Sequence, residues 1–256
     1  MMSDRSGFAA QASLVLDKDY KKGMKGKKVR LIQEWLCLHG YQIVIDGDFG
    51  DATDASVRKF QQEKKLEIDG VVGNRTFKKL VLPMTEALKE ISPGKKGVGQ
   101  MVVAYAKQHL KQHPREVGGQ NKGPWVRFYM QGNEGSDWPW CAGFVSFILK
   151  QACKSLSVSP PIQPSFSCDS LAFSAKERGL FLKESEVKKE KAIAPGSLFL
   201  DRRTPTDWVH TGIVFSAEED VFHTIEGNTN DDGDREGYEV CRRIRNYASK
   251  DFILLA

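Results

Sequence analysis

The stretch "SDWPWCAGFVSFILKQA", Ser136 to Ala152, places a cysteine at the front of an apolar run. Its apolar residues recur at helical spacing, which predicts an amphipathic helix that begins next to Cys141. Backbone N–H groups are unpaired in the first turn of a helix, and the helix dipole favours an anion there. A cysteine in that place ionises readily, and the thiolate is the reactive form. Cys141 is therefore a candidate nucleophile, although a buried structural cysteine would fit the same pattern.

Length and composition limit what kind of protein this is. With 256 residues, 40% hydrophobic and 28% charged, the chain suits a soluble protein of one large or two modest domains. No stretch approaches the ~18 apolar residues of a spanning helix, and the first residues lack the basic lead of a signal peptide. We therefore expect synthesis in the cytoplasm without a signal peptide. Five cysteines, an odd number without CxxC spacing, argue against a disulfide framework or a zinc ribbon.

The charge is unevenly distributed, because the formal net charge of +5 lies entirely within the first 97 residues. A basic surface there could attract nucleic acid or another acidic polymer, or it could simply be solvated. The sequence "KKGMKGKK", residues 21–28, departs from the phosphate-loop pattern because no Ser or Thr follows a Gly-Lys pair at the required spacing. We expect no nucleic-acid partner.

The first part of the chain contains a repeat. The segments "IDGDFGDAT" (residues 45–53) and "IDGVVGNRT" (residues 68–76) share the pattern I-D-G-x-x-G-x-x-T. In each, Asp-Gly favours a turn and the following polar residue can cap a helix. Together with the amphipathic segment "KKVRLIQEWLCLHG", they predict a small all-α domain of three helices. A calcium loop is disfavoured, because Gly50 stands where an oxygen ligand is needed.

These motifs resemble the peptidoglycan-binding domain family, whose pattern is matched at residues 36–41, 46–61 and 69–80. The resemblance implies peptidoglycan as a partner. We expect the domain to cover residues 1–82. Residues 83–97, with two prolines and a Pro-Gly, are predicted to be a linker.

The remaining residues, 98–256, change from helical periodicity to short alternating strands, which predicts an α+β domain. Two of the strands form a predicted hairpin with its turn at residues 218–220, so that His210 and Glu226 face each other at its open end. A cysteine, a histidine and a carboxylate or amide are the groups that thiol catalysis requires.

The segments "PWCAGFV", "VHTGIVF" and "EGNTN" resemble the CHAP family of cysteine, histidine-dependent amidohydrolases and peptidases. The resemblance implies a papain-like α+β fold with an antiparallel sheet and a mechanism without metal or cofactor. It makes Cys141 the nucleophile and His210 the base, with Glu226 and Asn228 as candidates to orient the imidazole.

Other residues near this motif have competing interpretations. Trp138 and Trp140 could stack on a sugar or line a peptide groove, and core packing fits them equally well. His223 is the rival base, although it can equally be an ordinary strand residue. His109 and His113 are four residues apart, but Leu110 replaces the Glu of a zinc protease, so we expect them to be surface or packing residues.

Together the two resemblances predict a monomeric peptidoglycan hydrolase that cuts an amide bond of the stem peptide or of its junction with muramic acid. It would act in the periplasm or cell wall as a phage endolysin or as an injected antibacterial effector. An effector would also meet secretion machinery and an immunity protein. Two alternatives are a noncatalytic cell-wall-binding protein, and a cysteine protease or acyltransferase that acts on proteins.

Overall fold

The computed structural model describes residues 14–190, 193–230 and 237–255. Backbone contacts divide the chain into two compact units, one of Met1–Leu88 with Arg115–Gly135 and one of Lys89–Pro114 with Ser136–Ala256. The N-terminal residues that we assessed for a signal peptide lie largely outside the residues that the structure describes. Within the described ranges, no helix has the length and apolar character needed to cross a membrane.

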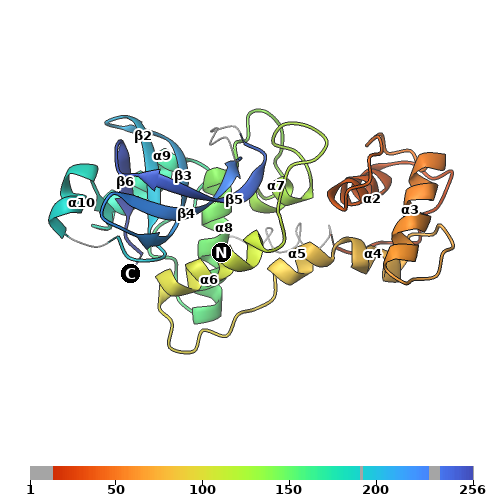
Figure 1. The fold of residues 1–256 in the computed structure, drawn as a ribbon, viewed down its shortest axis with the longest axis horizontal. Helices are drawn as coiled ribbons and strands as arrows, with labels where there is room; N and C mark the ends of the chain where they lie inside the picture. Colours follow the sequence, from red (N-terminus) through yellow and green to blue (C-terminus); the bar gives the residue numbers. More distant parts are fainter. Residues whose placement is uncertain (1–13, 191–192, 231–236, 256) are drawn as a thin grey trace. The chain divides into compact units, whose positions relative to one another are not determined.

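The first unit is helical in its described residues (Figure 1), with helices α2 (Lys27–Leu38), α3 (Asp51–Glu63), α4 (Asn74–Leu80), α5 (Leu82–Ala87) and α7 (Pro124–Tyr129). The repeat predicted α2, α3 and α4. In contrast, α5 lies at the start of the segment predicted to be a linker, and α7 comes from a segment assigned to the second domain. The helical unit is therefore larger than the three-helix bundle expected from the sequence.

Each repeated turn is held by a glutamine from the preceding helix. The side chain of Gln33 donates to Asp46 Oδ1 over 2.8 Å and accepts from the backbone N–H of Gly47 over 2.7 Å. Gln61 repeats the arrangement, donating to Asp69 Oδ1 over 2.7 Å and accepting from the next glycine over 3.0 Å. Both glutamines are 1% exposed. The repeat thus extends beyond the turn itself to a buried amide on the helix before it.

Replacing Gln61 with leucine should destabilise this unit. The buried N–H of Gly70 and the hydroxyl of Thr76 would both lose their hydrogen-bond partner Gln61. We expect a loss of about 2–3 kcal/mol in unfolding free energy, because each unsatisfied buried polar group costs about 1–3 kcal/mol. Urea unfolding followed by circular dichroism measures it. Gln62→Leu, an exposed neighbour, is the control, and an equal loss there would show that the Gln61 contacts contribute nothing.

The segment 115–135 packs within the first unit, although it lies between two helices of the second unit in sequence. Trp125 of α7 meets Trp35 of α2 edge to face, with ring centroids 6.1 Å apart. Arg127 donates to Glu34, which is only 1% exposed, and to Glu134. This differs from the expected boundaries of 1–82 and 98–256. The physical reason is that the buried Glu34 of α2, whose Oε1 accepts one long hydrogen bond of 3.4 Å from Arg30, gains closer hydrogen bonds from Arg127.

The second unit has helices α6 (Val98–Leu110), α8 (Cys141–Leu156), α9 (Cys168–Glu177) and α10 (Glu184–Glu190) beside one antiparallel sheet. The strand order is β1-β6-β2-β3-β4-β5. The bounds are β1 Phe181–Leu182, β2 Leu198–Thr204, β3 Asp207–Ala217, β4 Val221–Thr229, β5 Glu239–Asn246 and β6 Lys250–Ile253. The antiparallel C-terminal sheet confirms that part of the predicted fold, while the papain-like topology stays a prediction.

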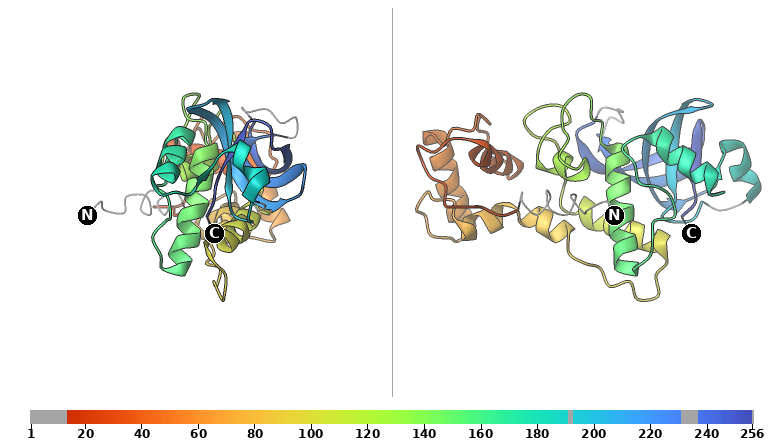
Figure 2. Two further views of the ribbon diagram at one scale, coloured as in Figure 1. Left: turned by 90° about the vertical axis from the view of Figure 1, so that its left-hand side faces the viewer. Right: turned by 180° about the vertical axis from the view of Figure 1, so that it is seen from behind.

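The packing of α8 on the sheet places the cysteine motif beside the hairpin. Strands β3 and β4 pair antiparallel, with Ile213 opposite Ile225, and the chain turns between Ala217 and Val221 as predicted. Helix α8 contacts both strands, and its Phe144 is fully buried. Figure 2 shows α8 and α9 on the same side of the sheet. The two helices therefore begin near the same pair of strands.

Candidate active site

Cys141 is the first residue of α8, as the sequence predicted, and it is 4% exposed. The helix begins where it does because the backbone of Trp140 is not helical, while its carbonyl accepts the N–H of Phe144 over 2.8 Å. No acidic residue stands in the first turn of α8. The thiol therefore meets the positive end of a helix dipole without a competing carboxylate on its own helix.

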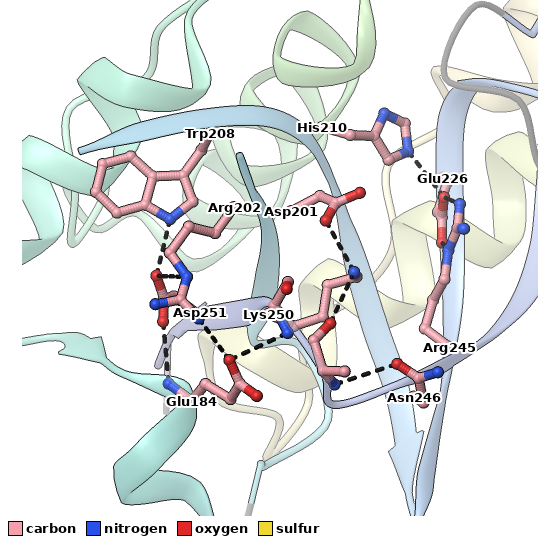
Figure 3. A network of polar contacts seen from close by, with 12 residues as sticks. Glu184, Asp201, Arg202, Trp208, His210, Glu226, Arg245, Asn246, Lys250 and Asp251 are labelled. Carbon is pink, nitrogen blue, oxygen red and sulfur yellow. Dashed lines mark hydrogen bonds and ion pairs between the residues drawn. The ribbon is translucent and has the colours of Figure 1, made fainter. Parts of the chain in front are cut away.

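His210 of β3 and Glu226 of β4 lie together at the open end of the hairpin. The Nε2 atom of His210 is 2.8 Å from Glu226 Oε2, and the two residues are 3% and 0% exposed. Figure 3 shows this contact, with the other ring nitrogen pointing away from Glu226. That nitrogen, Nδ1, makes no hydrogen bond of ordinary length. The Cys141 thiol is nonetheless near enough to the imidazole to raise the pKa of His210.

Glu226 is held by two further residues that sequence reasoning did not identify. Arg245 of β5 donates to both carboxylate oxygens, from Nε over 2.9 Å and from Nη2 over 2.7 Å (Figure 3). The hydroxyl of Thr224 donates to Oε1. A signal was present, because a carboxylate on a buried strand requires a cation, and "RRIRN" is the basic strand that follows. The carboxylate is therefore fixed in place by three different side chains.

The pKa values describe a charged site. Burial would raise the pKa of Glu226, but its hydrogen bonds to Arg245 and His210 lower it to about 2. Burial opposes the protonation of His210, but Cys141 and Glu226 outweigh it and raise the His210 pKa to about 10. Near neutral pH both groups are charged.

The pKa of the Cys141 thiol is well below its ordinary value. The neighbouring Cys168 thiol is the largest cause. Burial opposes the shift, while His210 and the backbone N–H of Ala142 add to it. These shifts favour a thiolate beside an imidazolium, with a carboxylate and a guanidinium behind it. This state can attack an electrophilic carbon and then deliver a proton to a leaving group.

Two hydrogen bonds hold the start of β3, the strand that carries His210. The backbone N–H of Trp208 donates to Asp169 of α9 over 2.8 Å, and its indole N–H donates to Asp251 of β6 over 2.9 Å (Figure 3). Trp208 is two residues before His210. The backbone just before His210 is therefore held by one residue of α9 and one of β6.

Two glycines allow the site to close. A Cβ atom on Gly227 would lie 2.8 Å from both Phe144 Cβ and Trp140 Cζ3, so β4 approaches the start of α8 only because this residue lacks a side chain. A Cβ atom on Gly212 would lie 2.6 Å from Glu226 Cγ. Gly212 therefore provides the space that the carboxylate occupies beside His210.

A Gly212→Ala variant should shift the carboxylate and weaken the charged pair. We expect the pH midpoint for alkylation of Cys141 by iodoacetamide to rise by about one unit, because a displaced Glu226 stabilises the imidazolium less. Gly97→Ala is the control, since a Cβ atom there meets no heavy atom within 4 Å. Unchanged profiles in both variants would mean that the position of Glu226 does not tune the thiol.

The other predicted residues separate into different environments. Trp140 is fully buried and packs against β4, which fits the core-packing alternative, and its role as a substrate contact stays a prediction. Trp138 is half-buried, with its ring edge to face against Phe166 at 6.4 Å, and its role stays a prediction. Asn228 is buried in the left-handed region with φ 57°, beside a register shift of β4, and its role also stays a prediction.

The rival histidines lie elsewhere. His223 contacts Glu218 over 3.0 Å and pairs with Ser216 near the turn of the hairpin, away from the open end. His109 is buried, 2.9 Å from Gln151 Oε1, and packs on aromatic rings of α8. Among the residues that the structure describes, no group of three His, Cys, Asp or Glu side chains is placed to hold a metal ion.

A second cysteine stands beside Cys141. The sulfur atoms of Cys141 and Cys168 are 4.0 Å apart, and Cys168 is the first residue of α9. This proximity could not be predicted from a sequence pattern, because 26 residues of helix and irregular chain lie between the two cysteines.

Comparisons with known proteins bear on the helical unit. Residues 25–80 match the family model described as a putative peptidoglycan binding domain. The zinc D-Ala-D-Ala carboxypeptidase of Streptomyces albus G is 40% identical over 62 residues, which is 23% of this chain and 24% of that protein. The chain thus matches about a quarter of that relative. These findings support a peptidoglycan-binding domain in the first unit.

Solved structures match between 25% and 41% of this chain. A peptidoglycan-binding protein from Clostridioides difficile, in complex with glutamine hydroxamate, is 41% identical over 25% of this chain and 40% of its own, with a TM-score of 0.24. A fused Zn-dependent amidase/peptidase/peptidoglycan-binding domain-containing protein from Clostridium acetobutylicum is 41% identical. The match covers 25% of this chain and 28% of that protein, with a TM-score of 0.25. The Burkholderia AP3 phage endolysin is 22% identical. The match covers 41% of this chain and 40% of the endolysin, with a TM-score of 0.24.

Proposed function

We propose that the protein is a peptidoglycan hydrolase that cleaves an amide bond by thiol catalysis. The observation that carries the proposal is the buried contact of His210 with Glu226 beside a first-turn cysteine whose pKa is lowered. The peptidoglycan-binding domain at residues 25–80 supports the choice of substrate. The site lies wholly within the second unit, so the first unit serves to bind the cell wall.

In the first half of the reaction, the Cys141 thiolate attacks the carbonyl carbon of the amide. The electron pair of the C=O bond moves to oxygen, and the backbone N–H groups at the start of α8 stabilise that oxyanion. The tetrahedral intermediate collapses as the C–N bond breaks. His210, protonated in the resting state, gives its Nδ1 proton to the leaving amine, and an acyl-thioester remains on Cys141.

In the second half, neutral His210 accepts a proton from water at Nδ1 while the water oxygen attacks the thioester carbon. The C–S bond then breaks, which releases the carboxylic acid and restores the thiolate and the imidazolium. Glu226 takes no proton in this sequence. With Arg245 and Thr224 it keeps the Nε2–H in place, so that Nδ1 is always the atom that transfers the proton.

The substrate amide belongs to the stem peptide or to its junction with muramic acid. Both settings proposed from the sequence, a phage endolysin and an injected effector, bring the enzyme to the cell wall. Two other functions compete with this proposal: a wall-binding protein without activity, and an enzyme that acts on proteins instead of peptidoglycan.

One assay separates these functions. Purified sacculi are incubated with the protein, and new amino groups are labelled with an amine reagent, with a denatured protein such as casein as the second substrate. Hydrolysis of peptidoglycan predicts new amino groups from sacculi and none from casein. Cleavage of casein alone would support a protein-directed enzyme. Sedimentation with sacculi without any new amino groups would support a noncatalytic binder. Mass spectrometry of the soluble products identifies the bond that is cut.

A further inference from the structure

Cys168 is a buried thiol that the proposed mechanism does not use. Its sulfur lies 4.0 Å from the sulfur of Cys141, and the two residues are 6% and 4% exposed. Each is the first residue of a helix, α9 and α8, and each helix presents its positive end to its own sulfur. Two sulfur atoms are thus held side by side, each at the start of a helix.

The start of α9 is held in this place by contacts on both sides. Ser146 of α8 donates its hydroxyl to the carbonyl of Ser165 over 2.7 Å and accepts the N–H of Ser165 over 3.0 Å. Asp169, next to Cys168, accepts the backbone N–H of Trp208 on β3 over 2.8 Å. These contacts on either side of Cys168 therefore hold it beside Cys141.

We propose that Cys141 and Cys168 are a modification site: a hydroperoxide oxidises Cys141, and Cys168 captures the product as a reversible disulfide. The two sulfurs must approach from 4.0 Å to the bond length of about 2.05 Å. The regulatory meaning, a thiol enzyme switched off under oxidising conditions, rests on the proposed function, whereas the disulfide chemistry does not.

The reaction balances in two steps. The Cys141 thiolate attacks one oxygen of the hydroperoxide, the O–O bond breaks, and the sulfur becomes a sulfenic acid, while the leaving oxygen takes up a proton as water or an alcohol. The sulfur of Cys168 then attacks Cys141 Sγ. The S–O bond breaks, and the hydroxide leaves with the Cys168 proton as water. An added dithiol reverses the disulfide by exchange.

Peptide mapping of the full-length protein after treatment with hydrogen peroxide tests the disulfide directly. We expect one cross-linked peptide pair that contains Cys141 and Cys168, lighter by two hydrogen atoms than the sum of the reduced peptides and absent after dithiothreitol. Cys153→Ala, which removes another buried cysteine of α8, should give the same cross-link. Cys141 recovered as sulfinic acid in the wild type, with Cys168 still reduced, would overturn the proposal.

Reversibility supplies a second readout. Treated wild-type protein should regain its reactivity with iodoacetamide, and its action on sacculi, after dithiothreitol. Treated Cys168→Ser should stay inactive, because sulfenic acid without a resolving thiol proceeds to sulfinic acid. Equal recovery in both would overturn the role of Cys168. If the cross-link forms but untreated protein releases no amino groups from sacculi, the proposed function fails and this inference stands.

Discussion

Cys141→Ala should release no measurable amino groups from sacculi. The substitution removes the one sulfur that stands at the start of α8 beside the His210 and Glu226 pair. Loss of a nucleophile that acts with its base typically lowers kcat by about 10⁴-fold or more. Alanine fits the space, because the site then contains fewer atoms and no new charge, so the cell-wall binding of the first unit should persist.

The matched control for this prediction is Cys153→Ala, since Cys153 lies on the same helix and is equally buried. Burial raises the pKa of that thiol, so it is not a competing nucleophile. Cys153→Ala should keep most of the hydrolytic rate. Hydrolysis by Cys141→Ala at the wild-type rate would remove the thiol from the mechanism, whereas a loss of sedimentation with sacculi would show that the substitution had damaged the fold.

Much of the local geometry could be predicted because it depends on short-range patterns. Helical spacing predicted Cys141 at a helix start, and strand alternation with a turn at residues 218–220 predicted that His210 and Glu226 lie together at the open end of the hairpin. The repeated Asp-Gly turns and the amphipathic segment before them led to helices α2, α3 and α4, and residues 25–80 match the family that those turns resemble. In each case, the residues that decide the structure are close in sequence.

What the sequence could not predict depends on contacts between distant segments. Arg127 pairs with Glu34 across most of the first half of the chain, and this places residues 115–135 in the first unit. Arg245 reaches Glu226 from the next strand, and Cys168 reaches Cys141 across an irregular segment. The two arginines neutralise buried carboxylates, and Cys168 lies beside the first residue of α8. A search for cations that could neutralise each buried carboxylate would have found two of the three.

Arg245→Met should both destabilise the protein and weaken the thiol site. The guanidinium donates to both oxygens of the fully buried Glu226, and it is 20% exposed itself. Removing one partner of a buried ion pair costs about 3–5 kcal/mol, because the remaining charge is left without compensation. The pKa of Glu226 should rise from about 2, and a partly protonated Glu226 would hold the imidazolium less firmly. We expect lower thermal stability at neutral pH and slower alkylation of Cys141 in weak acid.

The dependence on pH distinguishes this charge effect from simple loss of packing. The pKa of Glu226 is lowered in the folded protein, so its stabilising contribution is present above its ordinary pKa of 4.5 and is lost as the pH falls towards about 2. The difference in stability between wild type and Arg245→Met should therefore be largest near neutral pH and shrink in acid. Arg242→Met, on the same strand but exposed, should track the wild type throughout. A stability difference that stays constant from neutral pH down to about pH 2 would mean that Arg245 acts through its packing and not through the charge of Glu226.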